Sequence, residues 1–332
     1  MILQHRVRCL HRLRGYILGN DTSWKQVKEK ASSENGWFIP EFVELALKNI
    51  AHNFLEEQYL SKWAAQYGLV EEYNNPKTVG LVTAGNIPLV GFHDVLSIFM
   101  SGHKAIIKQS SRDQVLLKHL TSVLTSWESE VDDLIRFSDI LKNCDAYIAT
   151  GSNNTSRYFE YYFGKYPHII RRNRTSVAIL GGDESDYELE KLADDVYQFF
   201  GLGCRNVTKI YVPANYNFEP MLLAFERYNY LADHHKYKNN YDYNLAIHIL
   251  NNKFYMTNGS LLLVEDSSMF SPISQLNYEY YSDQDSILSS IADSQEIQSV
   301  ISRAQTPFGR SQSPGLLDYA DGVDTMAFLQ SL

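Results

Sequence analysis

The sequence predicts an α/β fold built on a mainly parallel sheet, and three observations lead to that prediction. Between positions 78 and 180, short apolar runs alternate with longer helical patterns, as strands joined by crossover helices do. Polar residues follow the ends of these runs, where ligands bind in such sheets. The chain has 332 residues, more than one hydrophobic core usually organises, so a second α/β domain is expected.

The N-terminal part is predicted to be helical. Residues 1–19 carry four arginines among regularly spaced aliphatic side chains, which predicts a basic amphipathic helix with at most weak affinity for acidic lipid. Residues 24–67 continue at helical spacing and are expected to cover one flank of a sheet. No run is long and apolar enough to span a membrane, so stable membrane insertion is not expected.

Strands and helices then alternate along the chain. The expected order is strand 78–83, helix 90–100, strand 105–107, helix 114–128, strand 145–150, helix 154–163 and strand 176–180. Because the carboxyl ends of parallel strands meet at one edge of a sheet, polar residues that follow the strands are expected to converge on a ligand. These residues are Asn86, Lys108, Gly151, Ser152, Gly181 and Gly182. The chain has no Gly-x-Gly-x-x-Gly motif, so an ordinary dinucleotide fold is not indicated.

One thiol stands out, because Cys204 is flanked by Gly201 and Gly203. The residues before it, 187–200, follow helical spacing, and residues 208–212 form an apolar run typical of a strand. Glycines in this helix-to-strand turn allow another molecule to approach closely, which favours a catalytic nucleophile. A free cysteine in a soluble protein can equally be a small buried hydrophobe.

Composition excludes several function classes. A formal net charge of -9 argues against a nucleic-acid partner. The three cysteines lie far apart and fit neither a disulfide framework nor a zinc cluster, so a reducing cytoplasm is expected. A metal is not expected at Asp233-His234-His235, because adjacent histidines rarely converge on one ion. The Tyr- and Asn-rich stretch 236–244 predicts an exposed loop.

Six segments, taken in order, resemble the aldehyde dehydrogenase superfamily, and within it the acyl-CoA reductase branch, similar to the fatty acid reductases of bacterial luminescence systems. They are Asn86-Ile87-Pro88, Lys108, Thr150-Gly151-Ser152, Leu180-Gly181-Gly182, Phe270-Ser271-Pro272 and Pro307-Phe308-Gly309. The resemblance covers about Lys77 to the C-terminus. It implies N-terminal helices with a parallel-sheet cofactor domain over residues 1–185, a catalytic cysteine domain over 186–305, and a segment 306–332 that returns to the cofactor domain.

The resemblance also implies a reaction. Cys204 attacks an acyl-CoA, expected to be long-chain, and forms a thioester, while the Asn86 side chain and the Cys204 main-chain N–H hold the oxyanion. Reduced nicotinamide then converts the thioester to an aldehyde. The resemblance implies that Lys108, Gly151, Ser152, Leu180 and Gly181 contact the cofactor. The implied substrate contacts are Phe270 and Phe308. A homodimer is compatible with the same resemblance.

The turn after the second strand indicates which cofactor is bound. A carboxylate there would accept a hydrogen bond from the adenosine 2'-hydroxyl and repel a 2'-phosphate. This chain has Ser110, Ser111 and Arg112 instead. The expected cofactor is therefore NADPH, with NADH as the alternative.

Two positions depart from the family pattern. Ile179 occupies the place of a glutamate that serves hydrolytic members, which predicts that the thioester is resolved by hydride and not by water. Ser268 replaces a glutamate that holds the nicotinamide ribose, although Glu265 or Asp266 could substitute. The candidate substitute bases are Asp183, Glu184 and His93.

Two other functions stay open. The chain could be a non-catalytic module that kept this fold for binding or assembly. It could also reduce an acyl phosphate, a substrate that Arg205 would suit.

Overall fold

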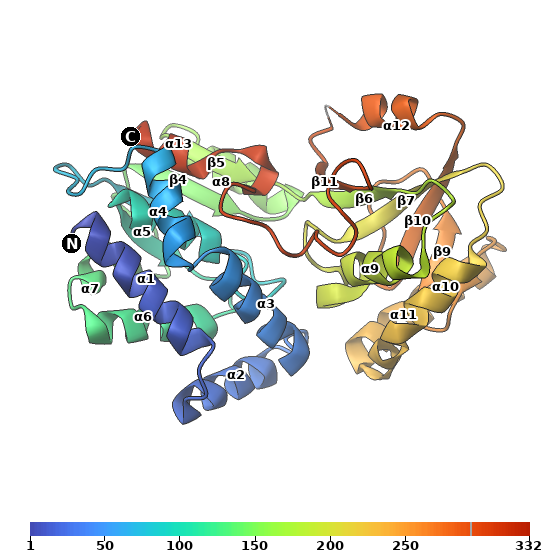
Figure 1. Cartoon of the computed structure of the whole chain (residues 1–332), viewed down its shortest axis with the longest axis horizontal. Helices are drawn as coiled ribbons and strands as arrows, with labels where there is room; N and C mark the ends of the chain where they lie inside the picture. The colour runs from blue at the N-terminus through green and yellow to red at the C-terminus, as the bar shows by residue number, and fades with distance from the viewer. Residues whose placement is uncertain (293) are drawn as a thin grey trace. The chain divides into compact units, whose positions relative to one another are not determined.

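The computed structural model describes residues 1–292 and 294–332. The chain divides into unit 1, made of residues 1–173 and 314–332, and unit 2, made of residues 174–313 (Figure 1). Each unit has its own sheet flanked by helices, so the predicted α/β class is confirmed. The first boundary lies earlier than the expected 185/186, because the strand at 175–179 pairs within the sheet of unit 2. The second lies at 313/314 and not at 305/306.

The sheet of unit 1 has five parallel strands in the order β3-β2-β1-β4-β5. The strands are β1 (Thr78–Val82), β2 (Lys104–Lys108), β3 (Ile135–Phe137), β4 (Ala146–Thr150) and β5 (His168–Arg171). Val79 pairs with Ala105 of β2 on one side and with Ala146 of β4 on the other. Because the strand order reverses at β1, the carboxyl ends of β1 and β4 flank the switch point where such sheets bind ligands.

Helices surround this sheet, and the predicted N-terminal helices are confirmed. They are α1 (Leu3–Ile17), α2 (Thr22–Glu34), α3 (Pro40–Asn53), α4 (Glu57–Gln66), α5 (Phe92–Ser101), α6 (Leu116–Trp127), α7 (Val131–Leu134) and α8 (Asn153–Phe163). The apolar face of α1 is buried in the core of unit 1, and Arg6 is buried as well, donating to Met1 O. The weak lipid affinity expected of this helix therefore has no exposed apolar face to support it. Over the described residues, no helix combines the length and the apolar character needed to cross a bilayer.

The C-terminal segment belongs to unit 1, where α13 (Thr325–Gln330) packs on α5 (Figure 1). His103 accepts from Lys77 N through Nδ1, so its Nε2 donates to Leu329 O at 2.9 Å. Arg171 forms a buried ion pair with Asp94 and donates to Thr325 Oγ1 at 2.9 Å. Two buried side chains thus fasten the last helix.

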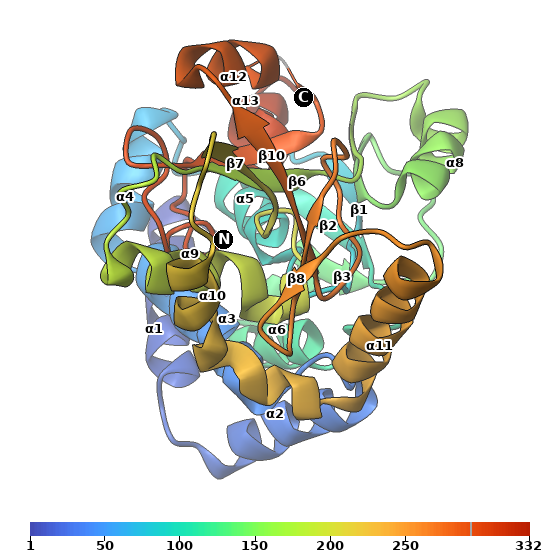
Figure 2. The same ribbon diagram turned by 90° about the vertical axis from the view of Figure 1, so that its right-hand side faces the viewer.

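The sheet of unit 2 has six strands in the order β11-β6-β7-β10-β9-β8. They are β6 (Thr175–Ile179), β7 (Val207–Pro213), β8 (Met256–Thr257), β9 (Leu262–Glu265), β10 (Gln275–Tyr281) and β11 (Ile297–Ile301). The pairings are parallel except between β8 and β9. The helices are α9 (Asp186–Tyr197), η1 (Gln198–Gly201), α10 (Glu219–Phe225), η2 (Glu226–Asp233), α11 (His235–Leu250) and α12 (Gln284–Ile291), and α9 packs on α10 (Figure 2).

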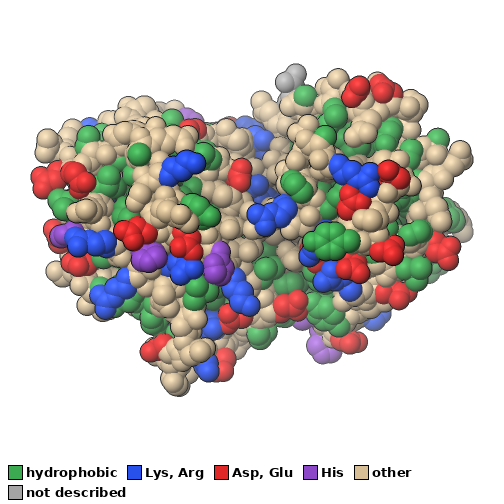
Figure 3. Space-filling view, in the orientation of Figure 1, with side chains coloured by type: hydrophobic (Ala, Val, Ile, Leu, Met, Phe, Trp, Pro, Cys, Tyr) green, Lys and Arg blue, Asp and Glu red, His purple; other side chains and the backbone are tan. Residues whose placement is uncertain are grey.

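The prediction of an exposed loop at 236–244 is wrong, because these residues lie in α11. Tyr237 and Tyr241 are buried on its inner side, and Tyr241 Oη lies 2.8 Å from Thr257 Oγ1. Tyrosine supplies apolar surface here while its hydroxyl finds a polar partner. On the face drawn in Figure 3, acidic and basic side chains are interspersed over both units.

Candidate active site

Four of the predicted site residues lie at one edge of the unit 1 sheet. Asn86 follows β1, the exposed Lys108 ends β2, and Gly151 and Ser152 follow β4. Ser152 caps α8, where its Oγ accepts from Thr155 N at 3.3 Å. An exposed helix N-terminus at the carboxyl edge of a parallel sheet can hold a phosphate.

The loop that carries Asn86 is tied to the turn after β2. The buried Asp113 carboxylate accepts from Leu89 N at 2.8 Å, and Gln109 Nε2 donates to Asp113 O at 3.0 Å. A Cβ on Gly85 would lie 2.7 Å from Ser110 Oγ, so the two segments need a glycine to pack this closely. Burial raises the pKa of Asp113 to about 6. The two loops form one fixed surface.

The turn after β2 presents polar side chains outward. Ser111 and Arg112 are exposed, and Ser110 is half-buried with its Oγ accepting from Arg112 N at 3.3 Å. Asn35 of unit 1 donates from Nδ2 to Arg112 O at 3.0 Å. The main chain is therefore anchored, and the Arg112 guanidinium extends from a fixed base.

Cys204 lies between η1 and β7, as the sequence predicts. The turn is strained, because Phe199 and Phe200 have φ values of 55° and 58° and Gly201 has φ 72°. Positive φ is costly for bulky residues and persists only where the surroundings enforce it. Both phenylalanine side chains are buried in unit 2, which supplies that constraint.

Asn206 fixes the shape of the cysteine turn, a role that the sequence analysis missed. Its Oδ1 accepts from Gly203 N at 2.8 Å. Its Nδ2 donates to Asp195 O at 3.1 Å and to Gln198 O at 2.8 Å, near the end of α9. The side chain is fully buried, so these bonds have no water competing for them. The signal in the sequence was a polar residue, Asn206, directly before the buried strand β7.

The three thiols differ in access. Cys204 is partly exposed, and its carbonyl accepts from Ser176 Oγ at 3.3 Å. Cys9 and Cys144 are buried, and burial raises the pKa of both thiols. A nucleophile must be reachable, and Cys204 is the most accessible of the three thiols.

The predicted substrate residue Phe270 lies in a segment that β7 and β10 hold by its carbonyls. Thr208 Oγ1 donates to Met269 O at 2.6 Å, and the buried Lys209 donates to Ser267 O at 2.8 Å. Asn277 Nδ2 donates to Phe270 O at 3.2 Å. Phe270 itself is half-buried.

The carboxylates expected to replace the missing glutamate near this segment differ in their contacts. Asp266 pairs with Lys253 at 2.7 Å, and the hydrogen bond from Lys253 lowers the pKa of Asp266. Glu265 is exposed at the end of β9. Phe308 is half-buried in the segment that follows β11. Over the described residues, no group of three His, Cys, Asp or Glu side chains is arranged to hold a metal ion.

The structure does not bring Leu180 and Gly181 together with Cys204. They follow the carboxyl end of β6, whereas Cys204 precedes the amino end of the parallel β7. The register pairs Ser176 with Val207 and Ile179 with Tyr211. Four residues of strand separate the two ends by about 13 Å.

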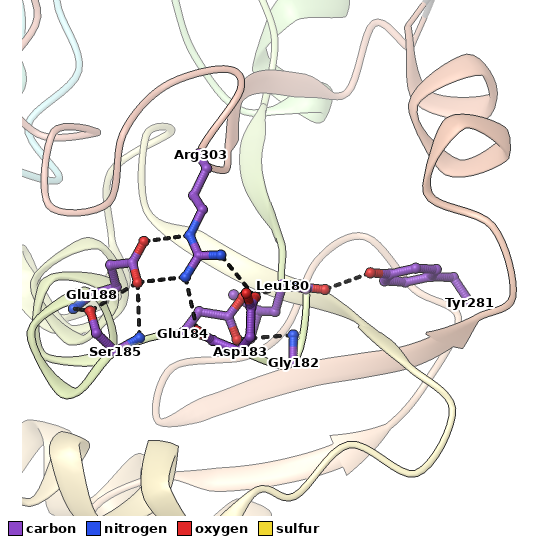
Figure 4. A network of polar contacts seen from close by, with 9 residues as sticks. Leu180, Gly182, Asp183, Glu184, Ser185, Glu188, Tyr281 and Arg303 are labelled. Atoms are coloured by element: carbon purple, nitrogen blue, oxygen red, sulfur yellow. Dashed lines mark hydrogen bonds and ion pairs between the residues drawn. The ribbon is translucent and has the colours of Figure 1, made fainter.

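The main-chain groups of these residues are also used within unit 2 (Figure 4). Leu180 O accepts from Tyr281 Oη at 2.7 Å, and the Gly181 N–H and Gly182 N–H both donate to the Glu184 carboxylate. The resemblance of this Leu-Gly-Gly segment to the family motif is one of letters and not of place.

Comparison with known proteins identifies the family of the chain. Residues 41–222, more than half of the chain, match the family described as acyl-CoA reductase (LuxC). The chain belongs to this family. No curated protein matches the sequence.

Solved structures similar to this LuxC-family chain include aldehyde dehydrogenases. Aldehyde dehydrogenase 21 from Physcomitrella patens, in complex with succinate, gives a TM-score of 0.65 at 13% identity over 91% of this chain and 74% of that one. HpcC from Thermus thermophilus gives 0.66 at 12% identity over 91% and 70%. An NAD+ complex of a Bacillus cereus aldehyde dehydrogenase gives 0.62 at 12% identity over 89% and 70%. The fold is therefore that of the aldehyde dehydrogenases.

The positions expected to supply or lack a general base in this LuxC-family protein have structural roles. Ile179 is buried in the core of unit 2 and pairs with Tyr211, away from the end of β7 that Cys204 precedes. A glutamate at this position would therefore not lie beside the thiol. Asp183 pairs with Arg303 at 2.8 Å, and Glu184 binds the two glycine N–H groups. His93 Nε2 donates to Leu316 O at 3.0 Å within unit 1, and its ring packs against aromatic rings.

Proposed function

We propose that this protein reduces an acyl-CoA to the aldehyde through a thioester on Cys204. The family and the fold indicate an oxidoreductase of the aldehyde dehydrogenase type. The observation that carries the finer proposal is the cysteine turn, where the one partly exposed thiol of the described residues lies in a turn clamped by Asn206. A fixed main chain costs no reorganisation when a tetrahedral intermediate forms.

The proposed chemistry takes two steps at the thiol. The Cys204 thiolate attacks the acyl-CoA carbonyl carbon, and the carbon–sulfur bond to CoA breaks, which releases the CoA thiolate. Addition of a hydride to the new thioester then gives a thiohemiacetal, which collapses to the aldehyde and regenerates the Cys204 thiolate. The Cys204 N–H and the Asn86 side chain are the proposed oxyanion donors. Asn86 belongs to unit 1, so its role stays a prediction.

The carboxyl edge of unit 1 suits a nicotinamide dinucleotide. The N-terminus of α8 at Gly151 and Ser152 would hold the pyrophosphate. Lys108 would contact the ribose. Ser110, Ser111 and Arg112 would receive the adenosine 2'-phosphate, which favours NADPH over NADH. When bound, the reduced cofactor supplies the hydride. Leu180 and Gly181 are left out of this proposal, because their main-chain groups are bonded within unit 2.

The substrate proposal follows from the family. A long-chain acyl-CoA is the proposed substrate, with Phe270 and Phe308 as contacts to its acyl part. Both side chains are half-buried, so each has apolar surface left to cover. The cytoplasm as location and a homodimer as assembly are further proposals.

One assay tests the function. Purified protein is given NADPH and a series of acyl-CoA esters of increasing chain length, and NADPH oxidation and aldehyde release are measured. Cys204→Ser should lose both, while it keeps the circular dichroism spectrum of the parent. Turnover by Cys204→Ser would refute the thioester. Turnover with acyl phosphates alone would reassign the substrate, and no turnover with either would favour a non-catalytic module.

A further inference from the structure

A segment of unit 2 lies along α9 and is bonded at two places on that side, in addition to the main-chain bonds that Thr306 makes with Val300 and Ser302. This segment, residues 303–311, is called the strap. At its start, Arg303 Nε lies 2.6 Å from Glu188 Oε1, and Arg303 Nη1 lies 2.8 Å from Asp183 Oδ1 (Figure 4). Hydrogen bonds from Arg303 lower the pKa of Glu188 to about 2. Arg303 and Asp183 are exposed and Glu188 is partly exposed, so this first attachment is a surface one.

The second attachment is buried and involves Asp195, near the end of α9. Asp195 Oδ2 accepts from Gly309 N at 2.6 Å, and Oδ1 accepts from Ser311 N at 3.0 Å. Asp195 is 1% exposed, and burial raises its pKa to about 6. Gly309 has φ 77°, and a Cβ there would lie 2.6 Å from Lys191 Cδ. The strap therefore fits against α9 only as a glycine turn.

The same residue also holds the cysteine turn. Asp195 O accepts from Asn206 Nδ2 at 3.1 Å, and Asn206 Oδ1 accepts from Gly203 N at 2.8 Å. The side chain of Asp195 thus bonds the strap, and its main chain bonds the turn that carries Cys204. Phe308 is the neighbour of Gly309, so its place is set by the same carboxylate.

We propose that Asp195 is a positioning residue, whose carboxylate holds the strap, with Phe308, in a fixed place relative to Cys204. This rests on the proposed function, because it assigns the strap as the wall beside the reacting thiol. The two bonds to Asp195 use different carboxylate oxygens, so replacing one oxygen with an NH2 group removes one bond and leaves the other. An acyl chain would meet the strap, whereas a small reagent would need only the thiol.

The proposal predicts different effects on two rates, the acylation and the alkylation of Cys204. A loss of folding would change both rates together. Asp195→Asn keeps the volume and the main-chain bond to Asn206, but its amide NH2 faces one of the strap N–H groups, so one strap bond is lost. We expect acylation of Cys204 by a long-chain acyl-CoA to slow by about tenfold or more, and alkylation by iodoacetamide to change by less than about threefold. A tenfold change corresponds to the loss of one hydrogen bond to a charged group.

Two further variants complete the test. Gly309→Ala displaces the strap from its own side, and combined with Asp195→Asn it should slow acylation no more than the worse single variant. Asp186→Asn removes an exposed carboxylate from the first turn of the same helix and is the matched control. It should stay within about twofold of the parent. Equal slowing of acylation and alkylation in Asp195→Asn, or slowing of neither, would overturn the proposal.

A readout that needs no catalysis distinguishes this proposal from the proposed function. Alkylation of Cys204 by N-dodecyl iodoacetamide is compared with alkylation by iodoacetamide itself. The ratio of the two rates should change by about fivefold or more in Asp195→Asn, even if the parent protein fails to react with acyl-CoA. Failure of the parent to react would count against the function, and an unchanged ratio would count against Asp195.

Discussion

Replacement of Asn206 by alanine should loosen the turn that carries Cys204. The change removes the acceptor of the Gly203 N–H and the donor to three carbonyls at the end of α9 and in η1. An unsatisfied buried donor costs about 1–3 kcal/mol, and the carbonyls lose a shared donor as well. We expect local opening to become easier by about 2–4 kcal/mol. At about 1.4 kcal/mol per tenfold, that is roughly 30- to 700-fold.

Hydrogen exchange of the amides at 203–206 measures this opening directly. Local opening is the suitable quantity, because a chain of two units need not unfold in one step. The control is Asn239→Ala, which changes an exposed asparagine of α11 and should leave these amides within about twofold of the parent. Exchange in Asn206→Ala that stays within about threefold of the parent would refute the clamp.

Three more predictions follow from the same structure. Iodoacetamide should modify Cys204 at least about tenfold faster than Cys9 or Cys144, which are buried with raised pKa values, and peptide mass spectrometry checks the order. Arg112→Ala should reduce the preference for NADPH over NADH by about tenfold in kcat/KM, and an unchanged ratio would remove Arg112 from the site. Arg171→Met strands a buried carboxylate and should destabilise unit 1 by about 3–5 kcal/mol in urea unfolding, whereas a cost below about 1 kcal/mol would contradict the importance of the pair.

The sequence predicts unit 1 well for a physical reason. Its strands are short apolar runs, and they are bounded by helices with a clear apolar face. The strand pattern and the helix pattern can therefore both be recognised in the sequence. The same alternation places Asn86, Lys108, Gly151 and Ser152 at one edge, which the structure confirms. The short edge strands β3 and β5 were not predicted, because three or four residues are too few to show a clear hydrophobic pattern.

Unit 2 was harder to predict because its information is not local. The helix at 235–250 buries tyrosines and not aliphatic residues, so its polar composition resembled a loop. Leu180-Gly181-Gly182 matched a motif by letters, but strand register decides which end of a sheet a segment reaches, and register depends on distant pairing. Asn206 and Asp195 act through main-chain partners that no spacing rule encodes.

The central claim is that Cys204 carries the acyl group between CoA and the aldehyde. Neither Asp183 nor Glu184 is free to activate water beside the thiol, because both are bonded at the other end of the sheet. A general base speeds hydrolysis about a hundred- to ten-thousandfold, and because neither Asp183 nor Glu184 supplies one, we predict that water releases the acyl group slowly and that the thioester accumulates.

The most direct measurement is intact-protein and peptide mass spectrometry after mixing with a long-chain acyl-CoA. Without cofactor, we expect one acyl group per chain on the peptide that contains Cys204, with slow release of free acid. On addition of NADPH, the acyl mass should disappear and aldehyde should be released in equal amount. An acyl group on another residue, acylation of Cys204→Ala, or rapid release of excess free acid without cofactor would contradict the account.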